Sequence, residues 1–396
     1  MKTTIENKIN ELTQKYLSEV IEIRRHIHAN PELSFNEVNT SKFIASKLAE
    51  LGIEYKTGFA EHGILGIIKG EQKGKTIALR ADMDALPIVE ENEFSYKSKN
   101  KGVMHACGHD IHTACLLGAA KILNELKAHI KGTVLLVFQP GEELIPGGAK
   151  VMMEDGLFDD YQPDMIFGQH VYPQLEAGQI GMKSGNYMAS ADEIYITLKG
   201  KGGHAALPHN TIDTVLMASQ TVVSLQQIVS RFIPTQIPSV LSFGNIVCNS
   251  VMNVIPETVE LQGTFRIMNE EWRYKAHKKI KDLTESIAQG MGGGCDVDIK
   301  IGFPCLFNNE KLTEASKESA RDFIGEENVR DLDIRMTAED FAWFAQKYPA
   351  CFYRLGVGYS DGQVCGGLHT AKFNPNEKAI ETGMSMMAYL ALMSCE

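Results

Sequence analysis

The order of apolar and polar positions predicts alternating helices and strands along the first 186 residues. From Ile5 to Ile27, apolar residues recur at three- and four-residue steps, which predicts an amphipathic helix. Further helices are expected over 37–50 and from His109 to about residue 130, and strands at 63–70, 75–81, 133–140 and 164–170. The last two strands are nearly continuous apolar runs, typical of strands covered by helices on both sheet faces. This alternation predicts the α/β class.

The pattern changes near residue 187, where apolar and polar residues begin to alternate along the strands. Strands are expected at 192–200, 239–247, 258–267 and 295–303, and helices at 210–231 and 270–290. The order βαββαβ is that of a ferredoxin-like unit. We therefore expect a first domain at 1–186 and 304–396, and a ferredoxin-like domain inserted at 187–303. The expected elements after the insertion are helices at 310–324 and 338–347, a strand at 350–358 and a helix from about 375.

Composition and charge narrow the classes of function. The chain has 396 residues, of which 44% are hydrophobic, so it can bury a sizeable core. Its net charge is −11 and no dense run of Lys and Arg occurs, so neither nucleic acid nor an anionic membrane is an expected partner. The N-terminal residues lack the apolar core of a signal peptide, and no stretch approaches the ~18 apolar residues of a membrane span. The eight scattered cysteines are expected to be reduced thiols, and the expected location is the cytoplasm.

Residues that can bind metals follow the expected strands, at the sheet edge where α/β proteins bind ligands. They are Asp82, Asp84, Glu142, Glu143, His170 and His369, and a helix start after the second strand adds His105, Cys107, His109 and Asp110. Singly, each has an ordinary explanation: a buried thiol, a capping or surface histidine such as His112, or a solvated acidic pair. Together, Cys, His and Glu are the ligands of zinc and similar ions, and a glutamate beside a ligand suits a general base. The coincidence favours a catalytic metal site.

Several motifs occur in a fixed order along the chain: LRADMDALP (79–87), MHACGHDIHT (104–113), QPGEE (139–143), GQHVYP (168–173), GGHAALPH (202–209), NVIP (253–256), GTFR (263–266) and LHTAKF (368–373). With HIHANPELSF (26–35), they cover nearly the whole chain. This set resembles the metal-dependent amidohydrolase family of hippurate hydrolase, N-acyl-L-amino-acid amidohydrolases and auxin-conjugate hydrolases, a branch of the aminoacylase and zinc carboxypeptidase group. The resemblance implies a three-layer αβα catalytic domain of the zinc-exopeptidase type and an inserted ferredoxin-like dimerisation domain.

The resemblance also implies a reaction, the hydrolysis of the amide bond of N-acyl-L-amino acids by metal-activated water. Glu142 would be the general base and would then protonate the leaving amine. The implied ligands of two divalent ions per subunit are Cys107, His109, Glu143, His170 and His369, with Cys107 as the bridge. The wider group has His-x-Asp in place of Asp82-Met83-Asp84 and an aspartate in place of Cys107, and the hippurate-type branch shares both departures. Thiolate favours zinc, with Mn, Co and Ni as alternatives.

Further residues are assigned by the same resemblance. Asp82 and Asp84 are expected to hold a ligand histidine in one tautomer, with a helix or turn cap as the alternative for Asp82. His204 would reach the active site of a neighbouring subunit and donate to the oxyanion, and Asn253 and Arg266 are candidates for binding the substrate carboxylate. A homodimer is expected because the open edge strand of a ferredoxin-like sheet can pair with a second copy.

Three other functions remain as alternatives at this point. The first is a carboxypeptidase or dipeptidase that acts on short peptides. The second is a cysteine hydrolase with Cys107 as nucleophile and His105 or His109 as base. The third is a metal-stabilised binding protein without catalysis. The expected partner is thus a small molecule, either an N-acyl amino acid or a short peptide.

Overall fold

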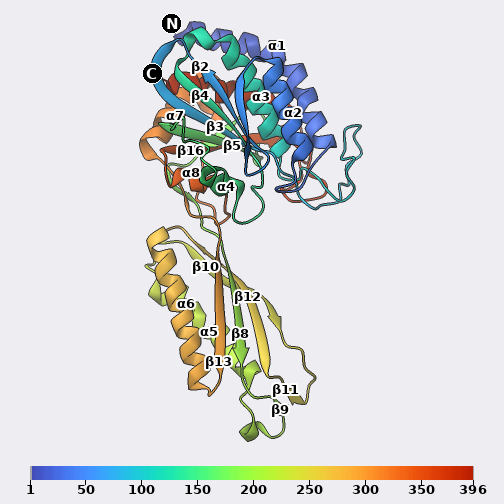
Figure 1. The fold of residues 1–396 in the computed structure, drawn as a ribbon, viewed down its shortest axis with the longest axis vertical. Helices are drawn as coiled ribbons and strands as arrows, with labels where there is room; N and C mark the ends of the chain where they lie inside the picture. Colours follow the sequence, from blue (N-terminus) through green and yellow to red (C-terminus); the bar gives the residue numbers. More distant parts are fainter. Residues whose placement is uncertain (1, 396) are drawn as a thin grey trace. The chain divides into compact units, whose positions relative to one another are not determined.

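The computed structural model describes residues 2–395, which form two compact units (Figure 1). The first unit contains the chain up to Gly185, Phe307–Asp333 and the chain from Trp343 onward. The second unit contains Asn186–Leu306 and Ile334–Ala342. The short strands β7 (Gly185–Met188) and β14 (Leu306–Asn308) lie where the chain passes from one unit to the other.

An eight-stranded sheet forms the centre of the first unit, in the order β1-β2-β4-β3-β5-β16-β6-β15. Its strands are β1 (Glu54–Phe59), β2 (Gly63–Lys69), β3 (Gln72–Asp82), β4 (Lys131–Gln139), β5 (Met165–Glu176), β6 (Ile180–Met182), β15 (Val329–Asp331) and β16 (Ala350–Gly358). β4, β3, β5 and β16 run parallel to their neighbours in this series, so their carboxyl ends share one edge. Every residue of β16 is buried, as expected where helices cover both faces.

Helices lie on both faces of this sheet, which gives the unit three layers. The helices are α1 (Lys2–Ala29), α2 (Val38–Glu50), α3 (His109–Glu125), α4 (Gly148–Glu154), α7 (Glu310–Ile324) and α9 (Ala379–Ser394). A Cβ placed on Gly63 of β2 would meet Met152 of α4 at 2.6 Å, and one on Gly66 would meet Leu48 of α2 at 3.5 Å. Residues three apart on a strand point to opposite faces. Thus α2 and α4 cover opposite faces of β2.

The second unit is a four-stranded antiparallel sheet with the order β10-β12-β8-β13. Its elements are β8 (Asp192–Lys199), α5 (Thr214–Gln227), β10 (Ser239–Val247), β12 (Thr258–Ile267), α6 (Glu270–Gly290) and β13 (Gly294–Ile301). Apolar residues of α5 and α6 form one core with Ile194, Ile196 and Leu198 of β8. A short ribbon, β9 (Gly203–His204) with β11 (Val254–Ile255), extends this unit. The α/β class with a ferredoxin-like insertion is confirmed.

The helix predicted at 338–347 is wrong, because the structure has only the one-turn helix α8 (Ala342–Ala345). The backbone before α8 is used in other bonds. The amide of Ala189 donates to the carbonyl oxygens of Arg335 and Thr337 at 3.1 Å each, and the amide of Phe341 donates to the Glu339 side chain. Helix α5 likewise begins at Thr214 and not at 210, because the Asp213 carboxylate accepts the amides of Val215 and Leu216.

Within residues 2–395, no helix has both the length and the apolar character that crossing a bilayer requires. The eight cysteines all lie in this range and are free thiols.

Candidate metal centre

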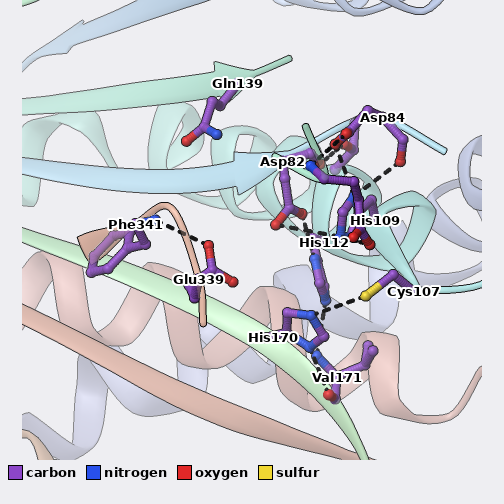
Figure 2. Close-up of polar contacts among 12 residues, drawn as sticks. Asp82, Asp84, Cys107, His109, His112, Gln139, His170, Val171, Glu339 and Phe341 are labelled. Carbon is purple, nitrogen blue, oxygen red and sulfur yellow. Dashed lines mark hydrogen bonds and ion pairs between the residues drawn. The ribbon is translucent and has the colours of Figure 1, made fainter. Parts of the chain in front are cut away.

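The carboxyl-terminal edge of the large sheet brings together the metal-binding residue types of the first unit (Figure 2). Asp82 is the last residue of β3, His109 is the first residue of α3, and Glu142 and Glu143 follow β4. The prediction that His170 ends its strand is wrong, since β5 continues to Glu176. The pairing of β3 with β5 stops at Arg80 and Gly168, whereas β16 pairs with β5 beyond His170. His170 therefore lies beyond the last residue pair that joins β3 to β5, level with Asp82 at the end of β3.

The five expected ligands form two groups of three that share one residue. Cys107, His109 and His170 offer donor atoms that all lie within 4.8 Å of one another, and so do Cys107, Glu143 and His369. The thiol of Cys107 lies 3.3 Å from Nε2 of His170. Glu143 Oε1 lies 3.1 Å from Nε2 of His369. The geometry thus places Cys107 between two possible ion positions.

Oxygen acceptors fix the rings of His109 and His170 in one orientation. Nδ1 of His109 donates to the carbonyl oxygen of Asp84 at 2.9 Å and to its carboxylate at 3.0 Å. Nδ1 of His170 donates to the carbonyl oxygen of Val171 at 2.8 Å. In the neutral form of each ring, Nε2 is then the unprotonated nitrogen that a metal requires. Nε2 of His109 is buried and forms no hydrogen bond among residues 2–395, so the site fits an ion at this atom.

The loop that carries His369 is tied to the loop that carries Cys107. The backbone amide of His369 donates to the carbonyl oxygen of Ala106 at 2.9 Å. His369 has a positive φ of 61°, which is uncommon for a residue other than glycine, and its side chain is 53% exposed. The exposed His369 and the half-buried Glu143 thus form the open side of the cluster, and Cys107, His109 and His170 form its buried side.

His112 is a site residue that the sequence did not identify, and its interpretation as a capping or surface residue is wrong. It is fully buried, its Nδ1 donates to Asp82 at 2.5 Å, and its Nε2 accepts the amide of Val171 at 2.8 Å. Arg80 donates to the other oxygen of Asp82 at 2.6 Å. Burial alone would raise the pKa of Asp82, but Arg80 and the two histidines hold that pKa well below its ordinary value. Asp82 thus contacts His112, while Asp84 contacts His109.

The two adjacent glutamates have different surroundings. Glu142 is buried, and its carboxylate belongs to a group with His109 and Glu143 whose donor atoms lie within 4.8 Å of one another. The backbone amide of Glu143 donates to the Asp84 carboxylate at 3.0 Å, which links the loop after β4 to the loop after β3. Glu142 therefore lies beside the donors without belonging to either of the two groups that contain Cys107.

The other three expected residues lie in the second unit. His204 of β9 pairs with Val254 of β11, and the amide of Ala205 donates to the carbonyl oxygen of Asn253 at 3.0 Å. His204 and Asn253 are therefore neighbours, and both are exposed. Nδ1 of His204 accepts the amide of Ala206 at 3.1 Å, so a neutral ring carries its proton on Nε2. Arg266 is half-buried on β12, where its Nε donates to Thr264.

Comparisons with known proteins agree with these motifs. The N-acyl-L-amino acid amidohydrolase of Geobacillus stearothermophilus is 41% identical over 304 residues, which are 77% of this chain and 82% of that protein. Thermostable carboxypeptidase 2 of Saccharolobus solfataricus is 38% identical over 376 residues, 94% of each chain. The structure of Bacillus subtilis YXEP, a dinuclear metal-binding peptidase of the M20 family, has a TM-score of 0.82 and 33% identity, and the match covers 96% of this chain and 99% of that one. Residues 78–393 match the model of peptidase family M20/M25/M40, so this chain belongs to that family.

Proposed function

We propose that this protein hydrolyses the amide bond of N-acyl-L-amino acids at a pair of divalent metal ions. As a member of the M20/M25/M40 family, the chain is a hydrolase of amide bonds. The observation that carries the proposal is the position of Cys107, which belongs to two separate groups of three donors. One group would hold one ion with His109 and His170, and the other would hold a second ion with Glu143 and His369.

In this proposal, Glu142 performs the proton transfers. When bound, the ions polarise the acyl carbonyl and lower the pKa of water at the site. The Glu142 carboxylate accepts a proton from the attacking water, whose oxygen forms the new bond to the acyl carbon. As the carbon–nitrogen bond breaks, Glu142 returns that proton to the amine nitrogen. Its position beside His109 and Glu143 supports this role, because it puts the carboxylate within reach of water at the proposed ions.

The donor set favours zinc over harder ions. A thiolate and three imidazoles are soft-to-borderline ligands, which zinc binds well, and Mn, Co and Ni are the alternatives. Burial lowers the pKa of His170 well below its ordinary value, as does the nearby charge of Arg354, so this ring is neutral at neutral pH. A neutral ring is the form that binds metal. Elemental analysis of the purified protein identifies the ion, and two equivalents per chain are expected.

A homodimer belongs to the proposal because the second unit leaves apolar surface uncovered. β10 is an edge strand of its sheet, and an edge strand offers unpaired backbone groups to a second chain. Exposed apolar side chains accompany it on β10 and on α5, namely Val240, Ile246, Val215, Leu216 and Val223. In the dimer, Nε2–H of His204 would donate to the oxyanion at the partner's ions, and Asn253 and Arg266 would bind the substrate carboxylate.

Subunit mixing tests this composite site. Glu142→Gln and His204→Ala are each expected to be inactive, but a heterodimer of the two contains one complete site. Partial recovery of activity after subunit exchange supports the proposal. If exchange is demonstrated by mass or by fluorescence and no activity returns, each subunit works alone.

A carboxypeptidase that cleaves short peptides is the second candidate, since a relative of that name is 38% identical over 94% of this chain. A release assay separates the two. The metal-loaded protein is incubated with acetyl-, benzoyl- and indolyl-acyl amino acids and with dipeptides, and the free amine is measured. Faster release from the acyl amino acids is expected. Cleavage of dipeptides alone would replace the proposal with the second candidate.

A cysteine hydrolase is distinguished by inhibition. Burial and the charge of Glu143 raise the pKa of the Cys107 thiol, whereas a nucleophilic cysteine needs a lowered pKa. Chelation by EDTA should therefore abolish activity, and added zinc should restore it. Activity that survives EDTA and is lost with iodoacetamide would contradict the metal mechanism.

A further inference from the structure

The segment from Leu33 to Glu37 contacts the loops that carry the candidate site. Ser34 donates to the Asp84 carboxylate at 2.6 Å, and Glu37 Oε1 accepts the backbone amide of Gly141 at 2.7 Å. Gly141 lies in the loop after β4, directly before Glu142 and Glu143. A sequence segment more than 100 residues away thus bonds to the loop that presents both glutamates.

Gly141 is enclosed by this segment. Its φ is +64°, and a Cβ placed on it would lie 2.6 to 2.7 Å from ring atoms of Phe35. Its carbonyl oxygen accepts the amide of Gly148 at 3.0 Å. The aromatic ring lies against Cα, Glu37 holds the amide, and Gly148 holds the carbonyl. The path of the backbone into Glu142 is therefore set on three sides.

The Glu37 carboxyl is not needed to cap its own helix. It precedes α2, but its side chain makes no cap hydrogen bond there. The carboxylate of Glu32 instead accepts the amides of Asn39 and Thr40 at 2.9 and 2.8 Å. Glu37 is fully buried, and its Oε2 has no hydrogen-bond partner among the described residues. Burying a carboxyl group raises the free energy of the folded state unless a hydrogen bond compensates. The contact that compensates here is the one with the amide of Gly141.

We propose that Glu37 is a positioning residue, which holds the amide of Gly141 and, with Phe35, fixes the loop that carries Glu142 and Glu143. This inference rests on the proposed function only in assigning catalysis to that loop. Burial and the charge of Asp84 raise the pKa of Glu37 to about 8, so the side chain is neutral at neutral pH. Glutamine is neutral, has the same shape and also offers an acceptor oxygen. Glu37→Gln should therefore preserve the contact.

The test compares Glu37→Leu with Glu37→Gln, and uses Glu32→Leu as a matched control. Glu37→Leu removes the acceptor and leaves a buried amide unpaired, whereas Glu32→Leu removes the cap of the same helix without contacting Gly141. Amide hydrogen exchange of the metal-free protein is followed by mass spectrometry over residues 139–148. Exchange at Gly141 should rise at least ~10-fold in Glu37→Leu, because an unpaired buried donor destabilises the closed loop. It should stay near the wild-type rate in the other two variants.

Kinetics provide the second measurement, with the substrate cleaved best in the release assay. Glu37→Leu should lower kcat by about 10- to 100-fold with KM nearly unchanged, since misplacing a base affects the chemical step. Glu37→Gln should restore kcat. If Glu37→Leu does not fold, Glu37→Asp withdraws the acceptor oxygen by one methylene and takes its place.

Two results would overturn the inference. One is wild-type exchange at Gly141 in a folded Glu37→Leu or Glu37→Asp variant. The other is an equal rise in exchange at Gly141 in Glu32→Leu, which would show that destabilising α2 in general is enough to expose this amide. Because exchange needs no substrate, it decides the role of Glu37 even if the release assay contradicts the proposed function.

Discussion

Replacing Asp84 with asparagine tests whether Asp84 orients His109 for binding the proposed metal ion. One carboxylate oxygen of Asp84 accepts Nδ1–H of His109 at 3.0 Å. The other accepts the hydroxyl of Ser34 at 2.6 Å and the amide of Glu143 at 3.0 Å. All three partners are donors, and an asparagine has only one acceptor oxygen. In either orientation of the amide, its NH2 group faces a donor, so His109 or Glu143 must move.

The size of the effect follows from these contacts. Removing the outer partner of a metal-binding histidine typically lowers metal affinity by about 10- to 100-fold. That range corresponds to about 1.4–2.8 kcal/mol. Asp84→Asn should fall at the upper end, because the same change also disturbs the amide of Glu143, which is a proposed ligand of the second ion.

Metal affinity is measured by titrating the metal-free protein with zinc against a chromophoric chelator. Ser34→Ala is the matched control, because it removes one donor to Asp84 and leaves the charge and both other contacts. Its affinity should change by less than about threefold, the effect of one modest hydrogen bond. An unchanged dissociation constant in Asp84→Asn would refute the reasoning. An equal loss in Ser34→Ala would show that the local packing, and not the acceptor for His109, is responsible.

Three further outcomes are expected. Glu142→Gln should keep its metal content and lower kcat at least ~10²-fold, because the amide cannot accept the proton; near-normal turnover would remove Glu142 from the mechanism. Gly141→Ala should reduce the free energy of unfolding more than Gly52→Ala does. Both glycines have φ +64°, so an alanine at either position is strained by about 1–2 kcal/mol, but only at Gly141 does the added Cβ meet the Phe35 ring. Asp192→Asn should lower the free energy of unfolding in urea by about 1.5–3 kcal/mol, since the buried Arg273 loses the carboxylate that it contacts at 2.5 Å and keeps the Glu270 carboxylate at 3.0 Å. Burial raises the pKa of Asp192, but hydrogen bonds from Arg273 and His277 lower it more. The stabilisation is therefore full above the pKa of the unfolded chain, about 4, and is lost as the pH falls below that value. A difference in unfolding free energy between wild type and variant that stays constant down to about pH 3 would contradict that sign.

Elements with a clear apolar pattern and a clear end could be located from the sequence. Helix α6 begins after Asn269, whose side chain caps the amide of Trp272, and it ends at Gly290, which are the bounds that the pattern predicts. The helix predicted at 338–347 forms one turn only, because Arg335 and Thr337, just before it, accept the amide of Ala189. That pairing joins residues about 150 positions apart, and local periodicity contains no information about it.

The candidate site was partly predictable for a related reason. Residues that directly follow parallel strands meet at one edge, so Asp82, Glu142 and Glu143 could be placed from the strand pattern. His112 could not be placed in this way, because its Nε2 accepts the amide of Val171, which lies 59 residues away in the sequence. Its spacing of three from His109 puts both on one helix face, which was the available signal. The role of Glu37 depends on a contact with Gly141 and could not be read from its neighbours.

The balance of charge explains why such distant segments can pack together at this edge. Asp82, Asp84 and Glu142 are buried with the Cys107 thiol, and the half-buried Glu143 adjoins them. Arg80 neutralises Asp82, and the amide and hydroxyl donors on Asp84 stabilise its charge. Glu142, Glu143 and Cys107 would repel one another if all three were ionised, and a further positive charge would offset that repulsion. In the proposed function, two divalent ions would supply that charge, so folding of these loops and metal binding are expected to stabilise each other.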